Sequence, residues 1–222
     1  MEITPEIQER LEKLNGKYGA LGQDLLSYLD GLLYADVTTY WDYIKIDTLL
    51  SLQSPKTKFP DEVVFIIYHQ ITELYFKLCL REFEQLANAK ELTKKLFIAR
   101  VSRINRYFDA LIHSFEIMVD GMEKEQFLKF RMSLLPASGF QSAQYREIEI
   151  YSTDFINLVA KDKRAVYNPS SSIREMFEEI YWKYGATESD TQKKTLTLTQ
   201  FEERYKESFI VLGESCRVNN LW

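Results

Sequence analysis

The chain has 222 residues, of which 45% are hydrophobic and 14% aromatic, enough for a folded core and too apolar for a disordered segment. Its net charge is −5 at pH 7, and it lacks the clustered basic residues of nucleic-acid-binding proteins, so no nucleic-acid partner is expected. Residues 94–106 do carry several Lys and Arg, but these are spaced like the solvated face of a helix.

The cysteines and the N-terminus predict the cellular compartment. Cys79 and Cys216 do not make a disulfide framework, so we expect a reducing environment, with Cys79 as a buried free thiol. The first six residues are acidic and polar, unlike a signal peptide. We see no apolar run near the roughly 20 residues that a membrane helix needs. The sequence therefore predicts a cytoplasmic protein with no membrane contact.

All the predicted elements are helical, so the predicted fold class is an all-α, multi-helix bundle. Helix signals cover residues 5–18, 25–33, 61–88, 91–119, 123–135, 141–158 and 173–184, and residues 40–50 lead into a further helix. A last helix is capped by Thr197 or Thr199 and runs to Phe209, while the alternation at 193–198 is too short for a sheet. We divide the chain into a helical core, 1–150, and a helical extension, 151–222.

The helix at 61–88 has apolar residues on more than one face, as expected for a central member of a bundle. A cap at Asp61 follows the loop at 54–60. One stripe holds Ile67, Ile71, Leu74 and Leu78, and a neighbouring stripe holds Phe65, His69, Thr72 and Phe76. The sequence therefore places a histidine inside an apolar helix.

The stretch from Leu135 to Arg146 is the one that a generic helical scaffold does not need. Ser138-Gly139 predicts a tight elbow, because glycine can adopt the left-handed conformation that other residues avoid. Such an elbow lets backbone N–H groups and a small hydroxyl group approach a ligand closely. The preceding helix carries Arg131 among aromatic residues, so we predict a ligand site here.

Arg131 has two interpretations. A guanidinium group grips a carboxylate through two parallel hydrogen bonds, which suits a ligand with a carboxylate. The alternative is a structural ion pair with one of the many Glu residues, because an unpaired buried charge is costly.

His69 also has more than one interpretation. A neutral imidazole can hydrogen-bond a bound heterocycle. The alternatives are a satisfied core histidine or a pair with Glu73, four residues on. His113 lacks the Glu-x-x-His spacing of a di-iron bundle, and the two Cys and two His lack zinc-site spacing.

Three blocks of sequence, in order, resemble the tryptophan 2,3-dioxygenase family of heme enzymes. The blocks are Tyr40-Trp41-Asp42-Tyr43-Ile44 with Asp47-Thr48-Leu49-Leu50 and Gln53; Asp61-Glu62 with Phe65-Ile66-Ile67-Tyr68-His69-Gln70 and Glu73-Leu74; and Phe127-Leu128-Lys129-Phe130-Arg131 with Ser138-Gly139-Phe140-Gln141-Ser142 and Gln144-Tyr145-Arg146. The resemblance covers roughly residues 40–150 well and residues 151–222 loosely.

The resemblance implies an oxidoreductase with a helical bundle around heme b, of the tryptophan 2,3-dioxygenase and indoleamine dioxygenase type. The family inserts both atoms of O2 across the indole C2–C3 bond of L-tryptophan, giving N-formylkynurenine. This is the first step of tryptophan catabolism by the kynurenine pathway. The family assembles as a homotetramer.

The resemblance also implies residue roles. Arg131 would grip the substrate carboxylate, His69 would hydrogen-bond the indole N–H on the distal side of the heme, and Phe65 and Phe127 would pack on the indole. The family often has Tyr at the position of Phe127, so a hydroxyl contact is lost there. The other expected substrate-site residues are Ile66, Ile67 and Tyr68, together with Tyr40, Tyr43 and Ile44, which would reach a neighbouring subunit's pocket. Ser138 and Gly139 would lie against the heme edge.

The resemblance assigns no metal ligand to this chain. The family's proximal heme histidine lies far toward the C-terminus, so we expect it beyond Trp222 and expect the chain to be a piece of a longer protein. The alternative function is a heme-free tryptophan-binding or assembly module derived from the family. A third is a heme-binding relative that acts on another indole.

Overall fold

The computed structural model describes residues 3–35, 39–186 and 194–221, and the regular elements in these ranges are all helices, without a β-strand. The predicted all-α class is confirmed. The chain divides into two compact units, Met1–Leu52 and Gln53–Trp222. The proposed division of roles between residues 1–150 and 151–222 stays a prediction.

The first unit consists of short helices without a core. They are α1 (Pro5–Gly19), α2 (Leu25–Tyr34), α3 (Tyr40–Tyr43) and α4 (Ile46–Leu50). The Thr4 and Asp24 side chains cap α1 and α2 by accepting backbone N–H groups. None of the residues in these four helices is buried, and Leu32 and Leu33 are each 74% exposed.

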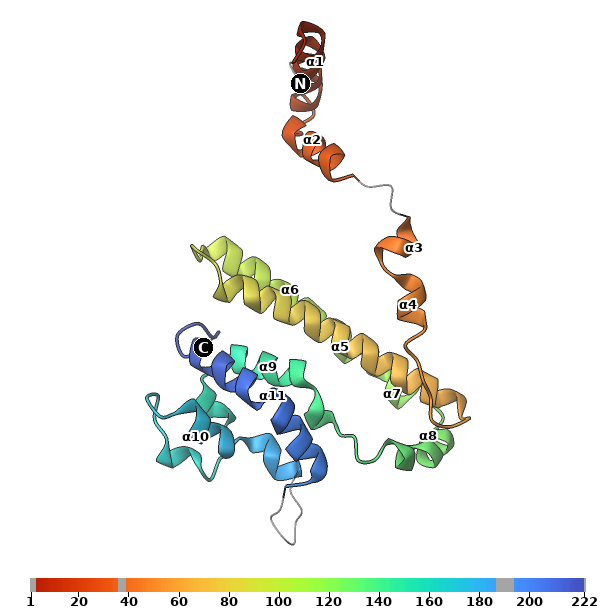
Figure 1. The fold of residues 1–222 in the computed structure, drawn as a ribbon, viewed down its shortest axis with the longest axis vertical. Helices are drawn as coiled ribbons and strands as arrows, with labels where there is room; N and C mark the ends of the chain where they lie inside the picture. The colour runs from red at the N-terminus through yellow and green to blue at the C-terminus, as the bar shows by residue number, and fades with distance from the viewer. Residues whose placement is uncertain (1–2, 36–38, 187–193, 222) are drawn as a thin grey trace. The chain divides into compact units, whose positions relative to one another are not determined.

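The second unit contains the long helices and both hydrophobic cores. Its α-helices are α5 (Pro60–Ala87), α6 (Lys94–Ser114), α7 (Glu116–Val119), α8 (Lys124–Phe130), α9 (Ala143–Ser152), α10 (Ile173–Glu178) and α11 (Leu196–Ser215). Short 3₁₀ helices are η1 (Arg131–Leu134), η2 (Gly139–Gln141), η3 (Phe155–Leu158), η4 (Arg164–Val166) and η5 (Tyr181–Ala186). Helix α5 packs against α6 and α9, and α11 packs against α9 and α10 (Figure 1).

One core lies between α5, α6 and α9, and the other among α9, α10, α11 and η5. The first includes Cys79, Phe83 and Ile104, so the predicted burial of Cys79 is confirmed. Burial raises the pKa of the Cys79 thiol to about 11, which keeps it protonated and unreactive. In the second core, α11 approaches so closely at Gly213 that a Cβ atom there would lie 2.8 Å from Ile173.

Helix α5 is confirmed, but its predicted cap is wrong. Pro60 begins the helix after Phe59, so Asp61 lies inside the first turn and is not its cap. The apolar stripe of Ile67, Ile71, Leu74 and Leu78 is between 38% and 48% exposed. Helices α6 and α9 cover other faces of α5, through residues such as Cys79 and Leu80.

Helix α5 is also long and apolar enough to cross a membrane, contrary to the expectation that no run reaches that length. Length and composition alone are weak evidence for a membrane span, because a core helix passes the same test. Helix α5 packs along α6 in this unit.

Several predicted helices are shorter than expected because the chain turns inside them. The expected helix at 91–119 divides at Phe115, and that at 123–135 becomes the 3₁₀ helix η1 at Arg131. The segments 141–158 and 173–184 likewise end in 3₁₀ helices, η3 and η5. The last helix is longer than predicted, and its cap is the Thr195 side chain, which accepts the Leu198 N–H at 3.3 Å.

The basic face of α6 is only partly solvated. Arg100 and Arg103 both lie within salt-bridge distance of the buried Glu82 on α5, at 3.4 and 3.1 Å. The expectation of a purely solvated face is therefore wrong at these two positions. A buried carboxylate needs such partners, since its desolvation is otherwise uncompensated.

A charged cluster ties η5 to α10 and α11. The ammonium group of Lys183 lies 2.6 Å from Glu202 and 3.1 Å from Glu178, and 4.1 Å from the centre of the Phe177 ring. Lys194 also reaches Glu202, at 2.5 Å. Burial alone would raise the pKa of Glu178, but bonds to lysines, first among them Lys206, outweigh it and lower the pKa to about 2. The pKa of Glu202 is lowered by the same balance.

This cluster predicts acid sensitivity. A carboxyl group whose pKa is lower in the folded chain stabilises the fold above its unfolded pKa of 4.5, and that stabilisation is lost as the pH falls toward about 2. We expect urea midpoints of the wild type to fall over this range. Glu202→Gln should cost about 2–4 kcal/mol at pH 7 and flatten the acid dependence. Glu203→Gln, an exposed neighbour, is the matched control; an unchanged slope in Glu202→Gln would contradict the assignment.

Candidate functional site

An aromatic cluster forms where α5 meets α8. The rings of Phe65 and His69, one helical turn apart, lie 4.0 Å apart between centroids. Phe127 and Phe130, from α8, lie 6.4 and 5.9 Å from Phe65. Phe65, His69 and Phe127, which the resemblance assigns to the substrate site, thus lie close together, while their roles stay predictions.

The tautomer of His69 follows from the hydrogen bond that its ring makes within the described part of the chain. Its Nδ1 lies 2.7 Å from the Phe65 backbone carbonyl oxygen. Because a carbonyl only accepts, Nδ1 carries the proton, and in the neutral ring Nε2 is left as an acceptor. The side chain of His69 is exposed, so the interpretation as a satisfied core histidine is wrong. The pair with Glu73 is also absent among the described residues, where Glu73 instead accepts the Gln144 amide at 2.8 Å.

Two cavities share Phe65 and His69 as a common wall. The larger, about 590 Å³, has mostly apolar and small polar walls, and its lining residues are Phe65, His69, Thr72, Glu73, Phe76, Leu134, Ala137, Ser138, Gly139, Gln141, Ser142, Tyr145 and Arg146. The smaller, about 480 Å³, is lined by Phe65, Tyr68, His69, Phe115, Met118, Val119, Met122, Lys124 and Phe127. Volumes of this size suit a small-molecule ligand.

Ser138 and Gly139 line the larger cavity, but not for the conformational reason predicted. Gly139 does not have a positive φ, so the left-handed elbow is wrong. Ser138 has extended backbone and immediately precedes η2, and its N–H donates to the Gln141 side chain at 2.9 Å. A Cβ added to Gly139 would meet nothing within 4 Å, so this part of the wall is open.

Arg131 is not among the residues that line the two cavities. It begins η1, is exposed, and makes no ion pair within the described part of the chain, so the structural ion pair is wrong. Its guanidinium group is therefore available to a ligand or to another chain.

The first turn of α5 and the loop before it contact the start of α8 and the η1 turn that follows α8. The Asp61 carboxylate accepts the Glu123 N–H at 2.5 Å, where α8 begins. Lys56 Nζ donates to the Ser133 carbonyl at 3.3 Å, in the turn that carries Arg131. The loop itself is fixed by Glu62, which is 1% exposed and accepts the Lys56 and Thr57 N–H groups at 2.8 and 2.7 Å. Burial would raise the pKa of Glu62, but hydrogen bonds from Thr57 and Lys56 lower it.

Sequence reasoning missed a buried arginine in the wall of the larger cavity. Arg146 is 8% exposed, and its Nη1 donates to Glu149 at 2.8 Å and to the Tyr181 hydroxyl at 2.9 Å. The Tyr181 hydroxyl in turn donates to Glu149 at 2.5 Å. Burial raises the pKa of Glu149, although Tyr181 and Arg146 oppose it. In the sequence, Arg146 ends the third block and lies one turn before Glu149, a spacing that is compatible with this ion pair. The contact with Tyr181 could not be predicted from the sequence.

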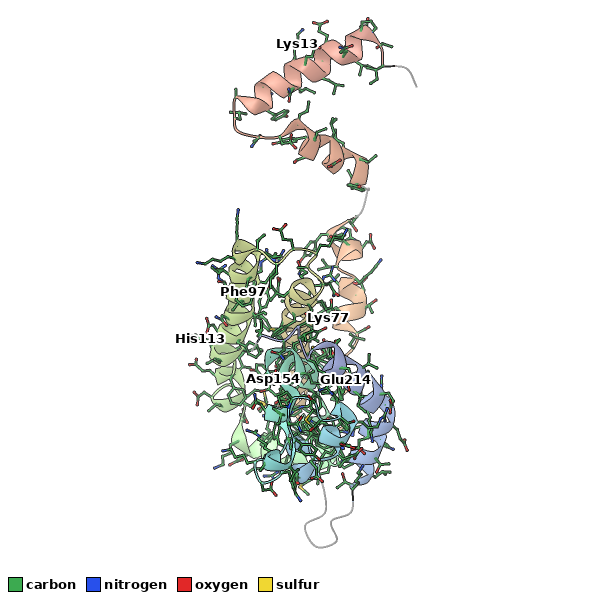
Figure 2. The ribbon with its side chains drawn as sticks, turned by 90° about the vertical axis from the view of Figure 1, so that its left-hand side faces the viewer. Lys13, Lys77, Phe97, His113, Asp154 and Glu214 are labelled. Atoms are coloured by element: carbon green, nitrogen blue, oxygen red, sulfur yellow. The ribbon has the colours of Figure 1, made fainter. Side chains whose placement is uncertain are left out.

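The remaining predicted site residues are dispersed. Tyr68 lines the smaller cavity and its hydroxyl lies 3.3 Å from Ser114 Oγ, whereas Ile66 and Ile67 line neither of the two cavities. Tyr40, Tyr43 and Ile44 belong to the first unit and are 70%, 79% and 38% exposed. His113 lies on α6 (Figure 2). Its Nδ1 lies 2.7 Å from the Asp109 backbone carbonyl oxygen.

Comparison with known proteins identifies the family. The sequence model of the family described as tryptophan 2,3-dioxygenase matches residues 32–207, most of the chain. The chain belongs to this family. Tryptophan 2,3-dioxygenase 2 of Ralstonia nicotianae is 42% identical over 126 residues, which are 50% of this chain and 33% of that protein. The enzyme of Sorangium cellulosum is 43% identical over 125 residues, 50% of this chain and 29% of the relative.

A third tryptophan 2,3-dioxygenase, from Ruegeria sp., is 41% identical over 120 residues, 52% of this chain and 42% of the relative. The matched part of the chain thus spans less than half the length of these curated relatives. The predicted family is confirmed, and the names of the relatives support an enzyme by resemblance.

Substitution of Glu62 tests whether its hydrogen bonds fix the loop before α5. Glu62→Gln should lower the free energy of unfolding by about 1–3 kcal/mol, because a buried amide cannot accept from all three donors as the carboxylate does. Hydrogen exchange should accelerate at the Lys56 and Thr57 amides. The exposed Glu125→Gln is the control. Unchanged protection of both amides would show that Glu62 does not fix this loop.

Proposed function

We propose that the chain forms the substrate side of a heme dioxygenase that opens the indole ring of L-tryptophan with O2 to give N-formylkynurenine. The observation that carries this proposal is the position of His69. His69 lies against Phe65 in the wall shared by the two cavities, and its Nε2 makes no hydrogen bond to the described residues. An indole N–H group can only donate a hydrogen bond, so it can pair with the accepting Nε2 of His69.

The aromatic residues would orient the indole. Phe65 and Phe127 line the smaller cavity on either side of His69 in sequence, and their rings offer apolar faces on which a flat heterocycle can stack. Phe127 has no hydroxyl group, so at this position the substrate would be held by ring contact alone. Indole orientation then depends on the single hydrogen bond to His69.

Arg131 would bind the substrate carboxylate. Its guanidinium group is exposed and makes no ion pair among the described side chains; Asp61 holds the start of the preceding helix α8, and Lys56 bonds to Ser133 within η1. An arginine fork pairs with a carboxylate in two parallel hydrogen bonds. Discrimination against indoles without a carboxylate would come from this pair.

The residues of the larger cavity fit the heme b that the family implies. The wall is largely apolar, and the Nε of the buried Arg146 has no hydrogen-bond partner there, which suits a carboxylate of the heme. Ser138, Gly139 and Arg146 would hold the heme edge. When bound, heme supplies the iron and the redox chemistry with O2. No group of three or more His, Cys, Asp or Glu side chains in the described part of the chain could hold a metal ion.

The family's homotetramer would complete the substrate pocket. Tyr40, Tyr43 and Ile44 would reach a neighbouring subunit, which agrees with the 70% and 79% exposure of the two tyrosines in this chain. We place the assembled protein in the cytoplasm.

The carboxylate clamp is tested with a substrate analogue. Arg131→Ala should weaken L-tryptophan binding about tenfold to a hundredfold and leave tryptamine, which has no carboxylate, nearly unchanged. Calorimetric titrations with and without hemin provide the measurement, with the exposed Arg106→Ala as the control. Equal losses for both ligands would refute the clamp. Tryptophan binding that is independent of hemin would favour the heme-free binding module.

The His69 contact is tested with an indole that lacks the N–H group. His69→Phe should weaken L-tryptophan binding about fivefold to twentyfold, because the indole N–H loses its acceptor, while 1-methyl-L-tryptophan should bind both proteins alike. His113→Phe, which removes the other histidine with the same local hydrogen bond, serves as the control. If the methylated ligand is also weakened, His69 acts by packing alone.

A further inference from the structure

Arg146 is held on one side only. Both protons of its Nη1 are used, one by Glu149 Oε2 and one by the Tyr181 hydroxyl oxygen. The Tyr181 hydroxyl proton goes to Glu149 Oε1, so the three groups close a ring of hydrogen bonds. Glu149 compensates the charge of the buried guanidinium, which is 9% exposed as a side chain.

The opposite edge of the guanidinium has no acceptor. Arg146 Nε is buried without a hydrogen-bond partner, and its Nη2 makes no hydrogen bond to any described residue. In an arginine, the N–H groups of Nε and Nη2 are parallel and form the fork that matches both oxygens of a carboxylate. Arg146 belongs to the wall of the 590 Å³ cavity, so this edge is a donor group of that wall without a partner among the described residues.

Aromatic rings fix the guanidinium in place. Its central carbon lies 4.8 Å from the centre of the Tyr145 ring, and 5.9 Å from those of Tyr181 and Trp182. Trp182 is itself buried in the second core, 5% exposed, next to Phe201 of α11. The orientation of Arg146 is therefore set by η5, which lies more than 30 residues later in the chain.

We propose that Glu149 and Tyr181 are positioning residues that hold Arg146 with its Nε–Nη2 edge ready for a carboxylate of the ligand in the larger cavity. The inference rests on the proposed function, in which that ligand is a porphyrin with carboxylate side chains. It adds that the segment after residue 150 shapes the cofactor site through the Tyr181 hydroxyl group. Neither Glu149 nor Tyr181 touches the ligand.

Binding of a metal-free porphyrin tests this arrangement without any catalytic readout. The probes are protoporphyrin IX and its dimethyl ester, which differ only in the two carboxylates, titrated into the full 222-residue chain by fluorescence. The wild type should prefer the diacid, and Arg146→Met should lose that preference by about tenfold or more. Tyr181→Phe and Glu149→Gln should each reduce the diacid-to-diester preference about threefold to tenfold.

The control is Tyr184→Phe, which removes a hydroxyl group from the same 3₁₀ helix, where it bonds Glu179 rather than Glu149. The preference is a ratio, so a fraction of unfolded protein does not change it. If Arg146→Met loses the preference but Tyr181→Phe and Glu149→Gln keep it, the positioning roles are wrong and the proposed function stands. A wild type that binds neither porphyrin, or binds both equally, would overturn the cofactor site and the positioning roles together.

Discussion

The bond between His69 Nδ1 and the Phe65 carbonyl is the interaction on which the proposed chemistry depends. It joins a side chain to the backbone of its own helix, one turn earlier, so its geometry needs no distant residue. It fixes the ring, and it decides which nitrogen can meet a ligand. Because α5 carries both Phe65 and His69, the packing of α5 against α6 and α9 determines where that nitrogen lies.

The charged residues of the second unit fall into two groups, those that have partners within the protein and those that do not. Glu62, Glu82 and the Lys183 cluster are buried and have their partners within the protein, so they specify the arrangement of loops and helices. Arg131 and one edge of Arg146 have none among the described residues. An exposed arginine without a partner costs little, whereas an unsatisfied buried Nε is costly unless a ligand or water completes it.

The family, the all-helical class and the meeting of Phe65, His69 and Phe127 could be predicted from the sequence, because each rests on local spacing or on a motif. Local spacing did not indicate where helices turn into 3₁₀ segments: Arg131 was expected inside an α-helix and begins η1 instead. The Asp61 cap failed for a similar reason, since Pro60 already starts the helix and leaves the carboxylate to α8. The Arg146–Tyr181 contact joins residues 35 apart in sequence, and no periodicity encodes such a pair.

The first unit, whose helices bury none of their residues, has a thermodynamic consequence. Isolated helices of fewer than about 15 residues are marginal in water, since nucleation costs more than their local hydrogen bonds return. With Leu32 and Leu33 in contact with solvent, these helices lack the apolar burial that stabilises helices elsewhere. On their own these helices would therefore be marginal, and burial of their apolar side chains against another chain would raise their helicity with protein concentration.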